Sequence, residues 1–296
     1  MTLALRRLFS EPLAVGRLTL PPIGLVLAAT VGAILLLVVV TTRWFEPTDE
    51  AAYWRAAERL ASGQPVYDPT AQPGTPYAYF YPPPLAQVLA PLTRLFDERI
   101  FTTAWTILLL GCLWWLGGRR PLVAIALVAF VPVAVELWYR NVHLVLAVLI
   151  VLALRRAPWL FAAAAAIKVA PVLGILYLAV RGRWRDAFLA TAVGGSILLV
   201  SVLASPDLWR SFIDTVLVTG PSMGASLVPV PFPVRAVIGV GLAVVAGRVP
   251  ERWGEPVLVL AIVVANPTLW ATVFSMLVAI VPLVRTRPPA REMEAV

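Results

Sequence analysis

Long apolar runs separated by short polar stretches make up most of this chain. Several runs are long enough to cross a hydrocarbon core of roughly 30 Å as α-helices. Since backbone polar groups in lipid must be paired within the segment, helices are the expected structure. The apolar runs cover residues 23–42, 101–118, 121–138, 142–154, 157–180, 186–204, 234–247 and 256–284. The pattern predicts an all-α polytopic integral membrane protein with about eight to ten membrane segments.

Two longer polar stretches interrupt this pattern. They cover residues 43–81 and 205–233, and the second contains a short amphipathic piece, DLWRSFIDTVL. No soluble domain or fixed-period repeat is evident, so we expect one transmembrane domain over residues 1–296. In this arrangement 43–81 is the first outer loop, with an amphipathic helix, and 205–233 is the second outer loop.

Arginine placement orients the predicted segments. Arg6, Arg7 and Arg17 precede the first apolar run, and basic residues concentrate on the cytoplasmic side of membrane proteins. The N-terminus is therefore expected inside and the first outer loop on the opposite face. The first run is too long for a simple signal peptide and no small-residue cleavage site follows it, which favours a signal anchor.

Two of the apolar runs are expected to be broken. Run 157–180 contains Lys168 and Pro171, run 256–284 contains the motif ANPTLW, and both have arginines on either side. Because arginines favour the cytoplasmic side, each run is predicted to enter and leave on that face as two half-helices. Proline removes an amide donor and disfavours helix at the preceding residue. The breaks would then line a polar cavity, and two kinked, fully spanning helices are the alternative.

Composition supports the membrane assignment and narrows the chemistry. The chain is 60% hydrophobic and 14% charged, with a formal net charge of +8 and a mean hydropathy of +0.86. In such a chain the arginine excess indicates membrane topology rather than nucleic-acid binding. One cysteine and one histidine exclude a disulfide framework and disfavour a zinc site. No metal or cofactor is expected.

Lys168 is the single lysine in the 296 residues, and it lies inside an apolar run. A lysine at the centre of a membrane helix costs about 2.5–3.5 kcal/mol on insertion scales, so it usually faces a cavity or a partner. Its ammonium would suit an anionic ligand such as a phosphate. The alternatives are a lysine that extends to the membrane interface, or one that pairs with Glu136.

The first outer loop contains EPTDEAAYWRAAERLASGQPVYDP. Thr48 or Asp49 is predicted to cap a helix that runs to about Ser62 and stops at Gly63. Asp49 and Tyr53 are four residues apart and so share a face of this helix. Asp49 is either a helix cap or a general base at the membrane surface, where an acceptor hydroxyl could reach it.

Two further stretches carry groups suited to a ligand. The stretch PYAYFYPPP contains an interfacial aromatic belt that includes Tyr81, and its flat rings would suit a sugar or an isoprenoid chain. In ELWYRNVHLVL, the residues Arg140, Asn141 and His143 are expected at the outer end of a helix pair, on the same side as Asp49. Together with Lys168 they could bind a phosphate.

Taken in order, these motifs resemble glycosyltransferase family 87. The shared pieces are short and extend over nearly the whole chain. They are DEAAYWRAA from Asp49, LASGQPVY from Leu60, FYPP from Phe80, APL from Ala90, NVH from Asn141, KVAP from Lys168, RGRWR from Arg181 and PTLW from Pro267.

The resemblance implies a GT-C-like helical bundle and an inverting transferase on the outer face of a bacterial plasma membrane. It implies transfer of a hexose, typically mannose, from a polyprenyl-phosphate sugar donor to a hydroxyl of a cell-envelope glycolipid or glycan. No metal is obligatory in this chemistry, because a lipid phosphate is already a good leaving group.

The resemblance also implies roles for individual residues, since Asp49 matches the position of the family's general base. The other expected site residues are Lys168, Arg140 and His143 for the donor phosphate, and Tyr53, Tyr81 and Asn141 as substrate-lining residues. Two departures stand out: Arg140 occupies a position where the family often has glycine or another small residue, and the chain is shorter after residue 204 than members commonly are. The alternatives are a transporter or flippase of a lipid-linked or anionic substrate, since broken helices also mark transport sites, and an inactive scaffold.

Overall fold

The computed structural model describes residues 13–15, 18–43, 48–68, 70, 78–219 and 226–285. The regular structure in these ranges is helical except for one hairpin, in which β1 (Leu13–Val15) pairs antiparallel with β2 (Leu18–Leu20). The helices follow in the order α2 (Ile23–Arg43), α3 (Asp49–Ala61), α4 (Pro83–Leu89), η1 (Ala90–Arg94), α5 (Glu98–Leu116), α6 (Pro121–Val128), α7 (Val131–Tyr139), α8 (His143–Arg155), α9 (Leu160–Ile167), η2 (Ala170–Val172), α10 (Leu173–Val180), α11 (Trp184–Ala204), α12 (Pro206–Thr219), α13 (Phe232–Arg248), α14 (Glu251–Val264), η3 (Ala271–Ala279) and α15 (Ile280–Arg285). The predicted all-α polytopic membrane architecture is confirmed.

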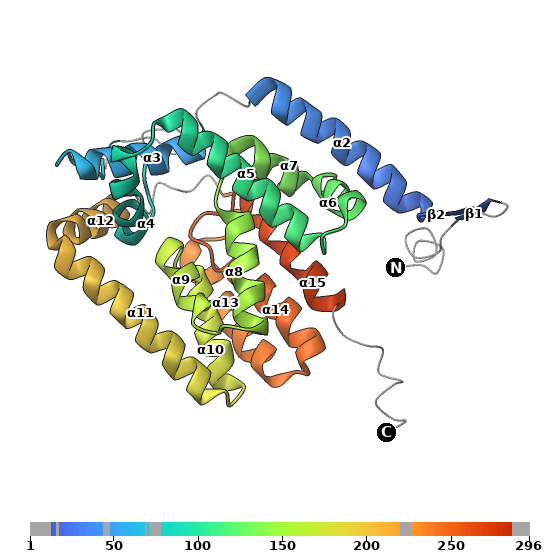
Figure 1. Cartoon of the computed structure of the whole chain (residues 1–296). Helices are drawn as coiled ribbons and strands as arrows, with labels where there is room; N and C mark the ends of the chain where they lie inside the picture. The colour runs from blue at the N-terminus through green and yellow to red at the C-terminus, as the bar shows by residue number, and fades with distance from the viewer. Residues whose placement is uncertain are drawn as a thin grey trace.

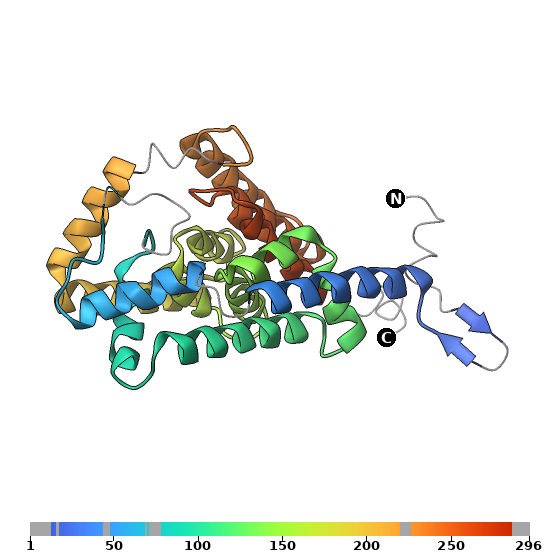
Figure 2. The same cartoon turned by 90° about the horizontal axis from the view of Figure 1, so that it is seen from above.

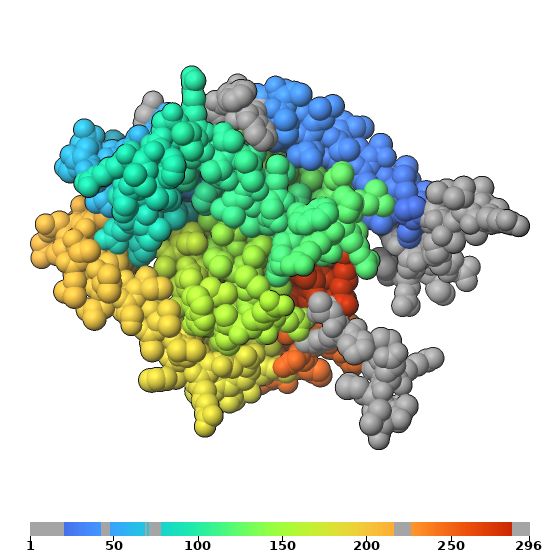
Figure 3. All heavy atoms as spheres, in the orientation of Figure 1, coloured from blue at the N-terminus to red at the C-terminus, as the bar shows by residue number. Residues whose placement is uncertain are grey.

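Three helices in the described part of the chain are long and apolar enough to cross a membrane: α2, α5 and α11. Helices α2 and α11 lie at opposite borders of the molecule (Figures 1 and 3). Each exposes large apolar side chains, for example Leu37 of α2 at 63% and Phe188 of α11 at 75%. Broad exposed apolar faces of this kind are typical of contact with lipid.

Helix α8 lies at the centre of the bundle. It packs against α5, α9 and η3, and Leu144, Leu146 and Ile150 along it are fully buried. Around it, α13 packs on α14 and α10, and α2 packs on α6 and α7. Helix α3 lies beside the start of α5 (Figure 2). The turn that leads into α8 contacts the start of α3 through Asn141 with Asp49 and Arg140 with Glu50.

The apolar run 121–138, expected as one membrane segment, is bent. It forms α6 and α7, which meet at an angle of 86°. Phe130 between them is extended, and Pro132 lies in the first turn of α7. Because proline cannot donate its backbone amide and restricts the residue before it, the helix cannot continue through this point. The bend matters for the site, because it sets the direction of α7.

Both predicted breaks are confirmed as interruptions of helix. Helix α9 ends at Ile167, Lys168 is extended with φ −141° and ψ 134°, and α10 begins at Leu173. The second break separates α14 from η3, over residues 265–270. There the buried Arg235 guanidinium donates hydrogen bonds to backbone carbonyls, including those of Asn266 and Pro267. Carbonyl groups that the helix leaves without a partner are thus satisfied by a side chain.

Candidate functional site

Helix α3 places Asp49 at its first position. The helix buries one face, which includes Tyr53 and Trp54, against α5, α4 and η1. Thr48 occupies the N-cap position but makes no side-chain cap bond. Gly63, with φ 72°, follows the helix end. The predicted helix is confirmed, whereas the carboxylate of Asp49 contacts another helix pair instead of capping its own helix.

The turn between α7 and α8 presents the residues that meet α3. Helix α7 ends with Arg140 in the left-handed region, at φ 50° and ψ 43°. The indole Nε1 of Trp105 donates to the carbonyl of Arg140 at 2.8 Å. The backbone amide of Val142 donates to Oδ1 of Asn141 at 2.8 Å. These bonds hold the short turn so that Asn141 and His143 face the start of α3 and the break after α9.

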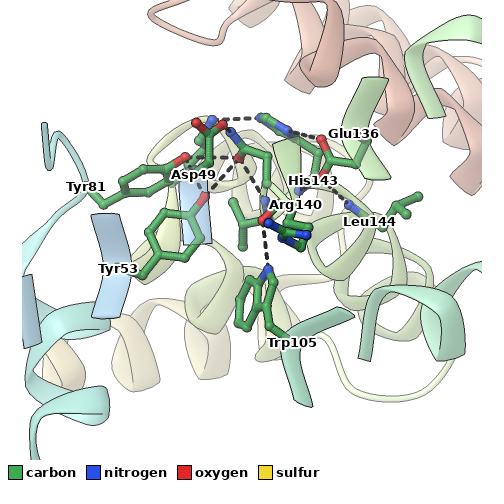
Figure 4. A network of polar contacts seen from close by, with 11 residues as sticks. Asp49, Tyr53, Tyr81, Trp105, Glu136, Arg140, His143 and Leu144 are labelled. Carbon is green, nitrogen blue, oxygen red and sulfur yellow. Dashed lines mark hydrogen bonds and ion pairs between the residues drawn. The ribbon is translucent and has the colours of Figure 1, made fainter. Parts of the chain in front are cut away.

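Asn141 connects a hydrogen-bonded network that includes Asp49, Tyr53 and Tyr81, which are labelled in Figure 4. Its Nδ2 donates to Oδ2 of Asp49. Its Oδ1 accepts from the hydroxyls of Tyr53 at 3.1 Å and Tyr81 at 3.0 Å. The two hydroxyl oxygens also lie 3.0 Å apart. The side chain of Asn141 therefore connects the carboxylate of Asp49 with two tyrosine hydroxyls, and both tyrosines are far from Asn141 in the sequence.

Lys168 adjoins the same network from the first break. Its Nζ lies 2.7 Å from Nε2 of His143 and 5.2 Å from the centre of the Tyr81 ring. The other ring nitrogen of His143, Nδ1, lies 2.9 Å from Oε2 of Glu136. The break that was expected to line a polar cavity thus contributes Lys168 to a network in which α3, α7 and α8 also take part.

Exposure separates the members of this network into two groups. Asp49, Tyr81 and Lys168 each keep part of their surface exposed. The remaining members are buried behind them: Tyr53, Glu136, Asn141 and His143. A ligand that approaches from outside would meet the carboxylate, the Tyr81 ring and the ammonium first.

The side chain of Arg140 forms an ion pair with Glu50. Its guanidinium Nε lies 2.8 Å from Oε1 of Glu50, and the two side chains are 2% and 0% exposed. Thr48 and Thr102 also donate to the Glu50 carboxylate. The guanidinium proposed from sequence to bind a phosphate is therefore engaged in a buried ion pair between α3 and α7.

Sequence reasoning did not identify Glu50 as the partner of Arg140, nor Glu136 as the partner of His143. The available signal was weak: Glu50 directly follows Asp49, and Glu136 lies in an apolar run. In the structure the adjacent residues Asp49 and Glu50 contact the adjacent residues Asn141 and Arg140. This double contact sets the position of α3 on the bundle.

Replacing Arg140 by glycine is expected to lower the thermal unfolding midpoint. Glycine relieves about 1–2 kcal/mol of left-handed backbone strain, but it leaves Glu50 as a buried charge without its ionic partner, at about 3–5 kcal/mol. Adding Glu50→Gln to Arg140→Gly should recover part of the loss, because the buried charge is gone. Thermal unfolding in detergent measures the midpoints of the single and the double variant. A midpoint for Arg140→Gly at or above wild type would contradict a stabilising role for the pair.

The environment of Asp49 changes its acidity. Burial raises its pKa from 3.8 to about 6, while the hydrogen bond from Asn141 and the positive charge of Lys168 act in the opposite direction. Burial also raises the pKa of Tyr53 well above its ordinary value. At neutral pH the tyrosine is therefore a hydrogen-bond donor, and the carboxylate is ionised with a proton affinity suited to a general base.

Within the described part of the chain, no group of three or more His, Cys, Asp or Glu side chains is arranged to hold a metal ion. The site is built from one partly exposed aspartate, one partly exposed lysine and aromatic rings. Such a set can accept a proton and stabilise an anion at neighbouring points.

Comparison with known protein families identifies a match over most of the chain. The family described as Glycosyltransferase family 87 matches residues 79–295. The matched range includes Tyr81, Asn141, His143 and Lys168. It begins after α3, so Asp49 lies outside it. No curated protein and no solved structure matches the chain. Because the family match covers well over half of the sequence and includes most of the network, the chain belongs to glycosyltransferase family 87.

Proposed function

We propose that this membrane glycosyltransferase moves a hexose, with mannose as the first choice, from a polyprenyl-phosphate sugar to a hydroxyl of a cell-envelope glycolipid or glycan. The observation that carries the proposal is the meeting of Asp49 and Lys168 at one partly exposed network. Their charges are close enough to influence each other, since Lys168 lowers the proton affinity of Asp49. Family membership supports a transferase over the transporter and scaffold alternatives.

In the proposed reaction Asp49 accepts the proton of the acceptor hydroxyl. The hydroxyl oxygen attacks the anomeric carbon and forms the new C–O bond as the bond from that carbon to the phosphate oxygen breaks. The electron pair leaves with the polyprenyl phosphate, and the configuration at the carbon is inverted. Lys168 stabilises the negative charge that develops on the phosphate.

The direction of α8 supports an active site on the outer face of a bacterial plasma membrane. Helix α8 begins at His143 in the network and ends at Arg155. At 1.5 Å per residue its two ends are roughly 20 Å apart. Arg155 and Arg156 at the far end are the kind of residues that mark the cytoplasmic side. The network then faces outward, where acceptors of the cell envelope are found.

The proposal is tested with purified protein in liposomes. We expect radiolabelled mannose to be transferred from polyprenyl-phosphate mannose to a lipid or glycan acceptor extracted from bacterial envelopes. Liposomes without protein are the control, and a nucleotide sugar in place of the lipid-linked donor tests donor class. Transfer from the nucleotide sugar alone, or no transfer from any polyprenyl-phosphate sugar, would contradict the proposal.

The raised pKa of Asp49 predicts a pH dependence of the rate. Only the ionised carboxylate accepts a proton, so kcat/KM should fall as the pH drops through about 6, by about tenfold for each further unit. Above pH 7 the carboxylate should be fully ionised and the rate independent of this group. Initial rates between pH 5 and 8 measure the profile. A rate that is constant from pH 5 to 7 would contradict Asp49 as the base.

A further inference from the structure

Glu136 is a buried carboxylate with two backbone amides at one oxygen and the imidazole of His143 at the other. Its Oε1 accepts from the backbone amides of His143 at 2.6 Å and Leu144 at 3.3 Å, and its Oε2 lies 2.9 Å from Nδ1 of His143. The two amides are at the N-terminus of α8, where the helix favours negative charge. Two amide donors on one oxygen, at the N-terminus of a helix, favour the ionised carboxylate.

The charge of Glu136 determines the tautomer of His143. A carboxylate only accepts and an ammonium only donates, so the neutral imidazole between them has one consistent arrangement. Its Nδ1 carries the proton and donates to Glu136, and its Nε2 lone pair accepts from Lys168 at 2.7 Å. His143 is 1% exposed. It therefore contacts the lysine behind the site and has almost no surface to offer a ligand.

We propose that Glu136 is a positioning residue that acts through His143: it holds the imidazole in the tautomer that anchors the Lys168 ammonium beside Tyr81 and directs it toward the donor phosphate. The phosphate part of this inference rests on the proposed function. One ammonium hydrogen is used on Nε2 of His143, and the other two are available to phosphate oxygens. Tyr81 supplies the second contact, since its ring centre lies 5.2 Å from Nζ.

Glu136→Gln is the informative change, because it keeps the size and removes the charge. The amide oxygen can still accept from the two α8 amides, which leaves the amide NH2 group facing Nδ1. His143 must then accept at Nδ1 and carry its proton on Nε2, where it meets the ammonium as donor against donor. The variant should therefore fold but lose the anchor of Lys168.

The chain has one histidine and one lysine, so nitrogen NMR reads the tautomer directly. Protein labelled with ¹⁵N-histidine and ¹⁵N-lysine, and purified with a tag that lacks both residues, gives one imidazole and one Nζ. We expect a protonated Nδ1 and an unprotonated Nε2 in wild type, the reverse in Glu136→Gln, and a shifted Nζ resonance in the variant. Wild type with its proton on Nε2, or a variant with an unchanged tautomer, would overturn the proposal.

Kinetics test whether Glu136 works through the lysine. Glu136→Gln is expected to lower kcat/KM for the lipid-linked donor at least tenfold. In a Lys168→Met background the same change should have no further effect, since the group it positions is missing. Losses that multiply in the double variant would overturn the proposal. Glu255→Gln is the matched control, because Glu255 is also buried but pairs with Arg155 at the other end of α8.

The proposed function and the positioning role of Glu136 can be contradicted independently of each other. If wild type transfers nothing from any polyprenyl-phosphate sugar while the tautomers are as expected, the proposed function fails and the positioning of Lys168 by Glu136 stands. If transfer occurs but Glu136→Gln changes neither the tautomer nor kcat/KM, the proposed function stands and the positioning role fails.

Discussion

Asp49→Asn is expected to reduce sugar transfer by about 10²–10⁴-fold, the range for loss of a general base. Asparagine has nearly the same shape, and its amide oxygen can accept the bond that Nδ2 of Asn141 now donates to Asp49. The fold and donor affinity should therefore be preserved, while no group remains to take the proton of the acceptor hydroxyl. The measurement is kcat with polyprenyl-phosphate mannose, together with the thermal unfolding midpoint.

The matched control is Glu58→Gln on the same helix. Glu58 accepts from the Trp54 indole at 2.9 Å and takes no part in the network around Asn141. It should transfer sugar at close to the wild-type rate. Equal rates for Asp49→Asn and wild type would show that Asp49 is not the base, even if transfer by wild type confirms the donor class.

Lys168→Met is expected to lower kcat/KM for the donor by about 10²–10³-fold, the usual loss when one group that stabilises a developing anion is removed. Methionine keeps the length of the side chain and suits the apolar surroundings, so the bundle should remain intact. Lys168→Arg should recover only part of the rate, because a planar guanidinium is larger and contacts His143 with a different geometry.

Binding of polyprenyl phosphate distinguishes a direct role of Lys168 from an indirect one. The reaction product carries the phosphate without the sugar, so its affinity should fall with Lys168→Met. Arg210→Met is the control cation, since Arg210 is exposed on α12 and pairs with Asp207. Unchanged product affinity and unchanged kcat/KM in Lys168→Met would exclude a phosphate-binding role.

The two changes affect different parts of one step. Asp49 acts on the acceptor and Lys168 on the leaving group, and Asn141, Tyr53 and Tyr81 connect them. A loss confined to acceptor activation is expected in Asp49→Asn, with product affinity retained. A loss of product affinity is expected in Lys168→Met. This difference separates the two roles even though both variants transfer little sugar.

Much of the helical framework could be predicted from the sequence. The apolar runs 101–118, 142–154 and 186–204 correspond closely to α5, α8 and α11, because hydropathy over a helix length is a local property of the chain. The breaks beside Pro171 and Pro267 were predicted for the same reason, since proline acts on its immediate neighbours. The bend within the run 121–138 was not predicted, because average hydropathy does not show the effect of Pro132.

For the candidate site, most members were predicted from the sequence, but the contact that Arg140 makes was not. The sequence indicated that Asp49, Tyr53, Tyr81, Asn141, His143 and Lys168 belong together, and the structure brings these residues into one network. Arg140 was grouped with them because it is next to Asn141 in the sequence. Its side chain instead faces Glu50, since its left-handed backbone turns it away from its neighbours. Adjacency in sequence is a poor guide to direction at a helix end.

The sequence by itself determined that the chain is an α-helical membrane protein, where two of its apolar runs break, and which polar residues are too costly to place in an apolar run without a purpose. Only the tertiary structure decided which partner each polar residue contacts. Glu50 with Arg140, Glu136 with His143, and His143 with Lys168 each require helices to pack in one particular register. Hydropathy and proline act over a few residues along the chain, whereas hydrogen bonds and ion pairs depend on distances of about 3 Å across it.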